Sequence, residues 1–162
     1  MKHSALPLAM MALIPWQLCS GQHHGQRIAP DGRSEISAVL AGSTIRVVFR
    51  AATVPISASD PSSRRYAQCT YSRVPCSLTE DIQISANGHE VFVPRAAYAD
   101  LGDISSAELT TNKGQMILTI QGGDASESYI AKLTFNRQRV LERRLYSGED
   151  ADHPLEISHF YQ

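Results

Sequence analysis

The chain has 162 residues, with 15 lysines and arginines against 16 aspartates and glutamates, and a formal net charge of −1. A balance this even offers no basic footprint for nucleic acid. The length fits one domain with a hydrophobic core. No apolar run reaches the roughly 20 residues that a transmembrane helix needs, so the sequence predicts neither a nucleic-acid-binding protein nor an integral membrane protein.

The chain begins with Met1, Lys2 and His3, and an apolar run, "ALPLAMMALIPW", follows from Ala5 to Trp16. A short basic start followed by an apolar run of this length is typical of a secretory signal peptide. We expect residues 1–21 to be that signal and the mature protein to be periplasmic or secreted. Removal of the signal after Ser20 or Gly21 would leave a small residue beside the cut.

Cys19 gives an alternative localisation, because a bacterial lipoprotein signal ends at a cysteine that becomes lipidated. The enzyme that cuts there prefers small residues before the cysteine, and this chain has Trp16, Gln17 and Leu18. A soluble mature protein is therefore the primary expectation, and a membrane-anchored lipoprotein is the alternative.

A polar stretch with Gly25, Pro30 and Gly32 follows, and it predicts a mobile leader over residues 22–34. Residues 35–162 are expected to form one β-rich domain. Its first element is a predicted hairpin, in which the alternating runs Glu35–Ala41 and Thr44–Arg50 flank a two-residue turn at Gly42-Ser43.

Cys69 and Cys76 stand close together in "CTYSRVPC". In an oxidising compartment, an even pair of this kind is typical of a disulfide. The residues between them include no His, Asp or Glu that would support a metal site, and the spacing is not the C-x-x-C of redox proteins. We expect a structural Cys69–Cys76 disulfide.

The strongest local pattern is "DIQISANGHEVFV", in which Asn87-Gly88 separates two alternating runs. Asn-Gly in this position is the signature of a type I′ hairpin. A two-residue loop fixes the register, so three cross-strand pairs are predicted: Ala86 with His89, Ile84 with Val91, and Ile82 with Val93. The next segment, "PRAAYADLG", predicts one short helix at about residues 94–101, with proline at its start and glycine after its end.

The rest of the chain alternates apolar and polar residues in four further runs and an expected edge strand: Ala107–Thr111, Gln115–Gln121, Ser128–Phe135, Gln138–Tyr146 and Leu155–Tyr161. In the third run Tyr129, Ala131, Leu133 and Phe135 share a face. The predicted fold is mainly β, an antiparallel meander or sandwich-like sheet with one short helix. We interpret the basic run of Arg137, Arg139, Arg143 and Arg144 as an edge strand protected against aggregation, or as a contact for an acidic partner.

The segment "GGDASES" between two of these runs is the one candidate site. We interpret it as a hairpin turn first, with glycine supplying positive φ, and as a binding tip second, because binding residues concentrate on exposed turns. The candidate binding residues are Asp124, Ser126 and Glu127. The segment lacks the carboxylate spacing of an EF-hand and the lysine of a P-loop.

Catalytic residues, metal ligands and cofactors are not expected. The six histidines form no spacing motif. The one metal alternative is Cu(II) or Ni(II) bound at the new amino terminus through His23 or His24.

Three segments resemble an uncharacterised family of small exported proteins of proteobacteria, periplasmic or lipoprotein-like: "NGHEVFVPRAAYADLGD", "LTIQGGDASESYIAKLTF" and "RVLERRLYS". The resemblance covers about half of the chain, from Cys76 to Ser147. It implies export, and it transfers no catalytic or ligand residue to this sequence.

Export, small size, a disulfide and polar turns together favour a periplasmic binding or inhibitor protein, similar in role to an immunity protein or a lysozyme inhibitor, rather than an enzyme. Its expected partner is another envelope protein. The alternatives are an envelope maintenance or assembly factor that uses its sheet edges, and a small hydrolase.

Overall fold

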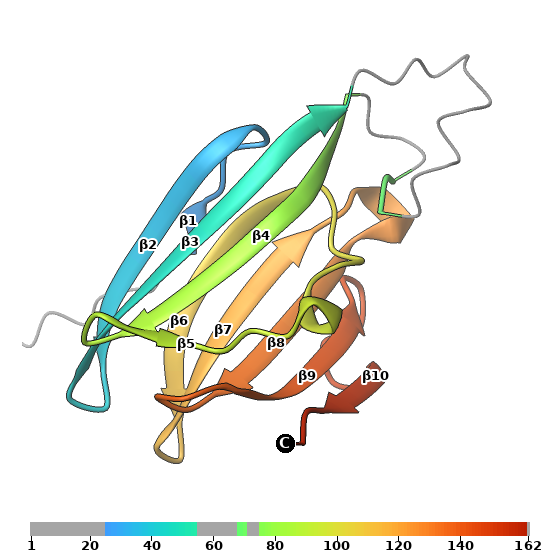
Figure 1. Cartoon of the computed structure of the whole chain (residues 1–162). Helices are drawn as coiled ribbons and strands as arrows, with labels where there is room; N and C mark the ends of the chain where they lie inside the picture. Colours follow the sequence, from blue (N-terminus) through green and yellow to red (C-terminus); the bar gives the residue numbers. More distant parts are fainter. Residues whose placement is uncertain (1–24, 55–67, 71–74, 162) are drawn as a thin grey trace, which may run out of the picture.

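The computed structural model describes residues 25–54, 68–70 and 75–161. Two antiparallel sheets pack face to face (Figure 1). One has four strands in the order β2-β3-β4-β5 and the other has six in the order β1-β6-β7-β8-β9-β10. The expected mainly β, sandwich-like fold is confirmed. The strands are β1 Gln26–Arg27, β2 Gly32–Leu40, β3 Ser43–Val54, β4 Cys76–Ala86, β5 His89–Val91, β6 Ile104–Asn112, β7 Gln115–Gly122, β8 Tyr129–Phe135, β9 Val140–Ser147 and β10 Pro154–His159.

The predicted Asn87-Gly88 hairpin is present. Both turn residues have positive φ, 51° and 82°, as a type I′ turn requires. The pairs Ala86–His89 and Ile84–Val91 form as predicted. The third pair, Ile82–Val93, does not form, because β5 ends at Val91.

The chain leaves the four-stranded sheet at Phe92, which bridges to Arg139 just before β9 of the other sheet. The Phe92 N–H donates to the carbonyl of Gln138 at 2.8 Å, and the Val140 N–H donates to the carbonyl of Phe92 at 2.9 Å. These two hydrogen bonds connect the sheets along one side of the sandwich.

Two predicted boundaries near the amino terminus are wrong. The β2–β3 turn is Ala41-Gly42, one residue earlier than predicted, since Leu40 pairs with Ser43 and both turn residues have positive φ. The predicted mobile leader extends too far: Gln26–Arg27 pairs with β6, Ile28 is buried in the core, and β2 begins at Gly32. The pairing with β6 joins residues far apart in sequence, which local patterns do not show.

The short helix predicted over residues 94–101 is a single 3₁₀ turn, η2 (Arg95–Ala97). Ala97, Tyr98 and Leu101 are buried, so this segment covers the core where β5 is too short to do so. A second 3₁₀ turn, η3 (Ala125–Glu127), lies in the β7–β8 connection.

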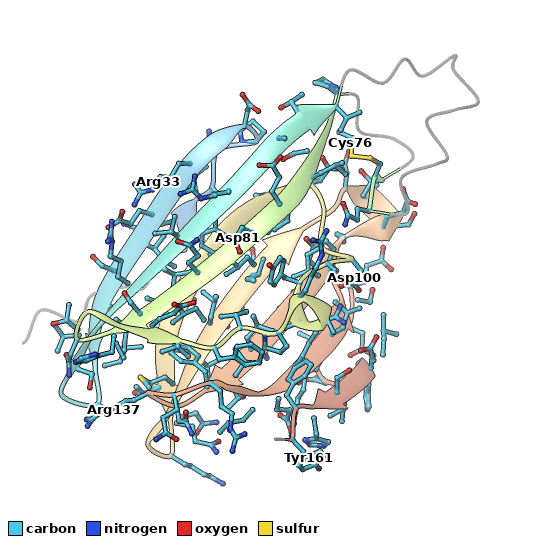
Figure 2. All side chains as sticks on the ribbon, in the orientation of Figure 1. Arg33, Cys76, Asp81, Asp100, Arg137 and Tyr161 are labelled. Carbon is cyan, nitrogen blue, oxygen red and sulfur yellow. A yellow bond between two sulfur atoms is a disulfide. The ribbon has the colours of Figure 1, made fainter. Side chains whose placement is uncertain are left out.

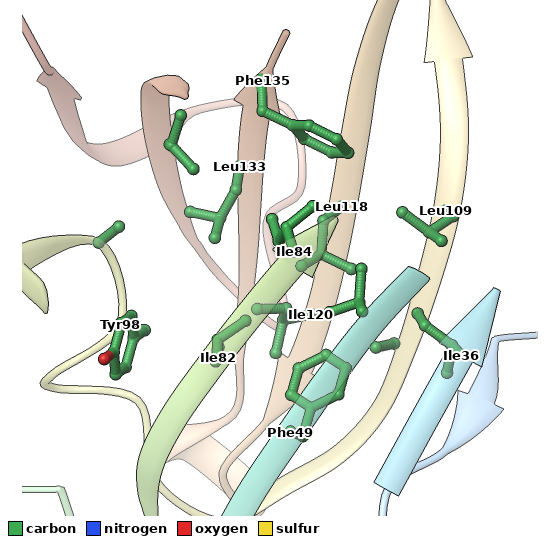
Figure 3. Packing of buried hydrophobic residues seen from close by; sticks show 14 of the residues in the cluster. Ile36, Phe49, Ile82, Ile84, Tyr98, Leu109, Leu118, Ile120, Leu133 and Phe135 are labelled. Carbon is green, nitrogen blue, oxygen red and sulfur yellow. The ribbon is translucent and has the colours of Figure 1, made fainter. Parts of the chain in front are cut away.

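The core lies between the two sheets (Figure 3). The inner face of the four-stranded sheet contributes Phe49, Ile82 and Ile84, and the inner face of the six-stranded sheet contributes Leu118 and Ile120 among others. The face predicted for β8 is confirmed: Ala131, Leu133 and Phe135 are fully buried, and Tyr129 is partly buried against the same cluster.

Arg143 and Arg144 of the Arg-rich run lie in β9, with Arg137 and Arg139 just before it, and the prediction that the run is an edge strand is wrong. β9 lies between β8 and β10. A β-bulge opposite Thr134 and Phe135 shifts its alternation, so Val140 and Arg143 both point inward and Glu142 points outward. The Arg143 side chain is only 4% exposed.

Two carboxylates hold Arg143. Its Nη2 donates to Asp100 Oδ2 at 2.6 Å, and its Nη1 donates to Glu156 Oε1 at 3.2 Å. The two carboxylate side chains are 54% and 47% exposed. The guanidinium is thus the desolvated member of the cluster, while its partners remain in contact with water.

This difference in burial predicts that removing the two carboxylate charges lowers the free energy of unfolding more than removing the arginine does. The double variant Asp100→Asn/Glu156→Gln should lower the free energy of unfolding by about 2 kcal/mol, because a buried charge loses its counter-charges. Arg143→Met should cost less, since it removes the buried charge and leaves two solvated carboxylates. Urea unfolding of both variants at pH 7 measures the order, and the reverse order would contradict this account.

Candidate functional site

The two loops at one end of the six-stranded sheet lie side by side. Successive turns of an antiparallel meander alternate between its ends, so the β7–β8 connection (123–128) and the β9–β10 loop (148–153) share an end. The Gly148 N–H donates to the carbonyl of Ser128 at 2.8 Å and joins them. Five exposed carboxylates project from the two loops. We name this surface the acidic end; its carboxylates are Asp124, Glu127, Glu149, Asp150 and Asp152.

The β7–β8 connection is a turn with a defined conformation. Asp124 accepts a hydrogen bond from the Ala125 N–H at 2.9 Å and caps η3. Gly123 has φ of 72°, and a side chain there would collide with the backbone of Glu127. Glycine is therefore required at position 123, and the Asp124 cap stabilises the turn.

The structure places all three predicted site residues, Asp124, Ser126 and Glu127, on the exposed side of this turn. The sequence analysis missed the β9–β10 loop as their neighbour. The register of β8 with β9, in which Tyr129 pairs with Ser147, brings them together, and the acidic composition of "SGEDADHP" is the signal that could have indicated it.

The β9–β10 loop is held in shape by Asp150. Its Oδ1 accepts hydrogen bonds from the N–H groups of Asp152 at 3.0 Å and His153 at 3.2 Å. The imidazole Nδ1 of His153 lies 3.1 Å from Oδ2. The backbone hydrogen bond from Asp152, followed by the side chain and backbone of His153, lowers the pKa of Asp150. Asp150 is therefore ionised at neutral pH.

Asp103 anchors the base of the acidic end. This buried carboxylate accepts hydrogen bonds from the Ser77 N–H at 2.8 Å and from the Thr70 hydroxyl at 3.0 Å. Its own carbonyl accepts from the Gly123 N–H at 3.2 Å. One residue thus connects the start of β4, the segment next to Cys69 and the β7–β8 connection.

The predicted Cys69–Cys76 disulfide is present beside this anchor. Gly102 passes close to the same segment, since a side chain at this position would collide with the carbonyl of Gln68. The Tyr129 hydroxyl donates to the Gly102 carbonyl at 2.8 Å. The acidic loops therefore project from a fixed base.

A pocket of about 380 Å³ lies at the other end of the six-stranded sheet, where β9 and β10 meet the C-terminal residues. We name it the β9–β10 pocket. Glu142 Oε1 accepts from Arg144 Nε at 2.6 Å, and His159 Nδ1 lies 3.5 Å from Glu142 Oε2. The lining residues are Gln115, Thr134, Arg139, Leu141, Glu142, Arg144, His159, Phe160 and Tyr161.

The order of side chains in this pocket does not match a hydrolase triad. Thr134 pairs with Glu142, and Glu142 pairs with His159, so the carboxylate lies between the hydroxyl and the imidazole. A nucleophile must contact its base directly, whereas Thr134 and His159 stand two strand spacings apart, about 9.5 Å. Among the described residues, moreover, no group of three or more His, Cys, Asp or Glu is placed to hold a metal ion.

The outer face of the four-stranded sheet has another hollow, of about 410 Å³, around Arg46 and Val48. Glu35 accepts hydrogen bonds from Arg46, at 2.5 Å from Nε and 2.7 Å from Nη2, and from Arg33. These two arginines, Arg46 first, lower the pKa of Glu35 to about 2. The charges on this face are largely paired with one another, which makes it a weaker candidate than the acidic end.

In the described part of the chain, the fold includes no helix with the length and apolarity to cross a bilayer. Comparison of the chain with protein-family models, with curated proteins and with solved structures gives no match. The function is therefore inferred from the surfaces of the described residues, and first from the acidic end.

Proposed function

We propose that this is an exported binding protein that recognises a basic protein of the envelope or the secreted medium through its acidic end, in the role of an inhibitor or immunity protein. The observation that carries the proposal is the hydrogen bond between Gly148 and Ser128. It fixes two loops together, so that five exposed carboxylates form one surface. The signal-like start and the Cys69–Cys76 disulfide support export, because disulfides persist in oxidising compartments.

Charge and shape together indicate the class of partner. Clustered carboxylates attract a cationic partner and raise its association rate. The loops are capped by Asp124 and Asp150 and rest on the Asp103 anchor, so little conformational entropy is lost when a partner binds. A cationic cell-wall hydrolase or a basic toxin has the matching chemistry.

We expect the partner to lose affinity when the acidic end is neutralised. The test variant is Glu127→Gln/Glu149→Gln/Asp152→Asn, which spares the two capping residues. The matched control removes three carboxylates elsewhere: Glu80→Gln/Glu90→Gln/Glu108→Gln. Partners are captured from envelope extracts with the mature chain, identified by mass spectrometry and measured by surface plasmon resonance, with a lysozyme as the first cationic probe.

The expected result is an association rate at least about tenfold lower for the acidic-end variant, with a weaker dependence on salt. The control triple should bind nearly as the wild type does. Equal losses in both variants would mean that net charge, rather than this surface, governs binding. A captured partner that binds the acidic-end variant normally would overturn the proposal.

The second candidate, an envelope assembly factor, is favoured by a different surface. β10 is the last strand of its sheet, and it exposes Leu155 and Ile157, which are 71% and 47% accessible. An edge strand with exposed apolar side chains can add a strand from another protein. The same capture experiment separates the candidates: several weak partners lost with Ile157→Lys would indicate assembly, and one tight partner lost with the acidic-end variant would indicate inhibition.

A further inference from the structure

We infer that the free edge of β2 is the interface of a symmetric homodimer, in which the β2 strands of two copies pair antiparallel and join the two four-stranded sheets. β2 is the outermost strand of its sheet (Figure 1). The acidic end is formed by loops of the other sheet, so the inference is independent of the proposed function.

Among the strands at the sheet edges, β2 presents the longest straight edge. It has nine residues and pairs with β3 in continuous register over Gly32–Leu40. β5 has three residues and β1 has two, and a bulge between Pro154 and Glu156 interrupts β10. Proteins protect exposed edges with short strands, bulges, proline or lysine. β2 has none of these features, and its two charged residues, Arg33 and Glu35, form an ion pair with each other.

The backbone groups at every second residue of β2 point away from the sheet. The Thr44 N–H donates to Asn87 Oδ1 at 2.8 Å, and the Thr44 carbonyl accepts from the Asn87 N–H at 2.8 Å. Because both groups of Thr44 face away from β2, its cross-strand partner Val39 stands in a non-hydrogen-bonded pair. The N–H and C=O of Val39 therefore point to the free edge. The same alternation directs the backbone groups of three further residues to this edge: Arg33, Glu35 and Ser37.

One two-fold axis uses all of these groups. When the axis passes between the two copies of Ile36, Arg33 pairs with the partner's Val39, Glu35 pairs with the partner's Ser37, and each pairing occurs twice. Each hydrogen-bonded pair exchanges two hydrogen bonds, which gives about eight between the copies. A shift by two residues in either direction shortens the paired segment, and in one direction it places the two Glu35 carboxylates opposite each other.

The side chains of the outer face match in this register. Val39 is 75% exposed, and the aliphatic stem of the partner's Arg33 would cover it; Figure 2 shows the Arg33 side chain on β2. Glu35 meets the partner's Ser37, whose hydroxyl donates to carboxylates. The two Glu35 carboxylates lie diagonally, about 7–8 Å apart, and each already accepts hydrogen bonds from Arg46 and Arg33. The edge is thus complementary to itself, which indicates a second copy as its occupant.

The inner face beside this edge is only partly covered. Ile36 and Ala38 line a hollow of about 180 Å³ together with Ala107 and Leu109 of β6. In the dimer the two Ile36 side chains lie side by side at the axis, in a non-hydrogen-bonded pair where side chains are closest. The partner strand covers part of each hollow, so pairing also removes apolar surface from water.

Sedimentation equilibrium of the mature chain from about 1 µM to 1 mM measures the association. A strand pair is a small interface, so we expect a dissociation constant of about 10–100 µM and a mass that levels off at two copies, because a two-fold interface closes. Val39→Lys should weaken the dimer at least about tenfold, since it places a lysine opposite the partner's Arg33. Ile157→Lys, the same kind of change at an exposed apolar residue of β10, is the matched control and should leave the dimer intact. Both side chains are exposed, so both variants should fold.

Amide hydrogen exchange followed by NMR identifies the paired strand. The amides of Arg33, Glu35 and Ser37 should exchange about threefold more slowly at about 1 mM than at about 50 µM, because dilution releases the monomer. The amides of Ser34 and Ile36 already face β3 and should not change.

Four outcomes would overturn the inference: a monomer at about 1 mM, a mass that rises beyond two copies, protection of β10 amides in place of β2 amides, or a Val39→Lys dimer as tight as the wild type. Protection of the β2 amides only after an envelope extract is added would assign the edge to a different protein, and it would overturn the homodimer as well.

Discussion

Leu133→Ala is expected to lower the free energy of unfolding by about 4 kcal/mol. Leu133 is fully buried on β8, where it pairs with Leu118 of β7 and belongs to the cluster shared by both sheets (Figure 3). Loss of its branched end removes apolar burial and leaves a cavity that the flanking strands cannot close, and leucine-to-alanine changes at such sites cost about 2–5 kcal/mol. Urea unfolding followed by circular dichroism measures the change.

Glu127→Ala is the control for this prediction, since it changes an exposed residue of the β7–β8 connection and should stay within about 0.5 kcal/mol of wild type. Asp124→Ala should cost somewhat more, up to about 1 kcal/mol, because it removes the cap of η3. A much larger loss for Asp124→Ala, together with calcium-dependent melting, would show that the connection is a structural ion site rather than a turn.

The parts of the fold that the sequence predicted correctly are those decided between near neighbours. Asn87-Gly88 fixes a two-residue turn, and the flanking alternation agrees with it, so two of the three predicted pairs are present. The face of β8 follows from its period of two in the same way. Both features depend on residues within about ten positions of one another.

The missed features arise from distant contacts. The bulge in β9 adds one residue against β8, so Val140 and Arg143, three positions apart, both face inward, and Asp100 and Glu156 hold Arg143 there. Strict alternation cannot show where a bulge occurs. The pairing of β1 with β6 likewise joins Gln26 to Ala107, a separation that no local pattern encodes.

The candidate site was predicted only in part for the same reason. The exposure of Asp124, Ser126 and Glu127 follows from turn composition, which is local. Their association with the β9–β10 loop depends on how β8 pairs with β9, and the β9–β10 pocket collects residues from positions 115 to 161. When a site consists of residues that lie side by side on several neighbouring strands, it can be predicted only if the register of each strand pair is known.

Asp103→Ala is expected to cost about 3 kcal/mol of unfolding free energy, through two separate effects. The first is the buried Ser77 N–H, which donates to Asp103 at 2.8 Å and would lose its acceptor, at a cost of about 1–3 kcal/mol. The second is backbone strain. Asp103 has φ of 49°, a conformation that aspartate and asparagine tolerate better than alanine does, by roughly 1 kcal/mol.

Asp103→Asn separates these effects from the loss of charge. Asparagine keeps an acceptor oxygen and the tolerance for positive φ, so this variant should retain most of the stability, with a loss of about 1 kcal/mol. If Asp103→Asn proved as damaging as Asp103→Ala, the negative charge itself, and not the hydrogen-bond geometry, would hold this region together.

The disulfide variant shows whether Asp103 and the Cys69–Cys76 bond stabilise the same segment. Cys69→Ala/Cys76→Ala should cost at most about 2.5 kcal/mol by the chain-entropy model for so short a loop. Asp103 contacts Thr70 and Ser77, the residues next to the two cysteines. The Asp103 hydrogen bonds and the disulfide therefore hold the same residues in place, so removing one of them leaves the other with less ordered structure to stabilise.

The triple variant Asp103→Ala/Cys69→Ala/Cys76→Ala should accordingly lose less unfolding free energy than the sum of the two separate losses, measured by urea unfolding as a double-mutant cycle. Strict additivity would mean that Asp103 stabilises β4 and the β7–β8 connection independently of the disulfide.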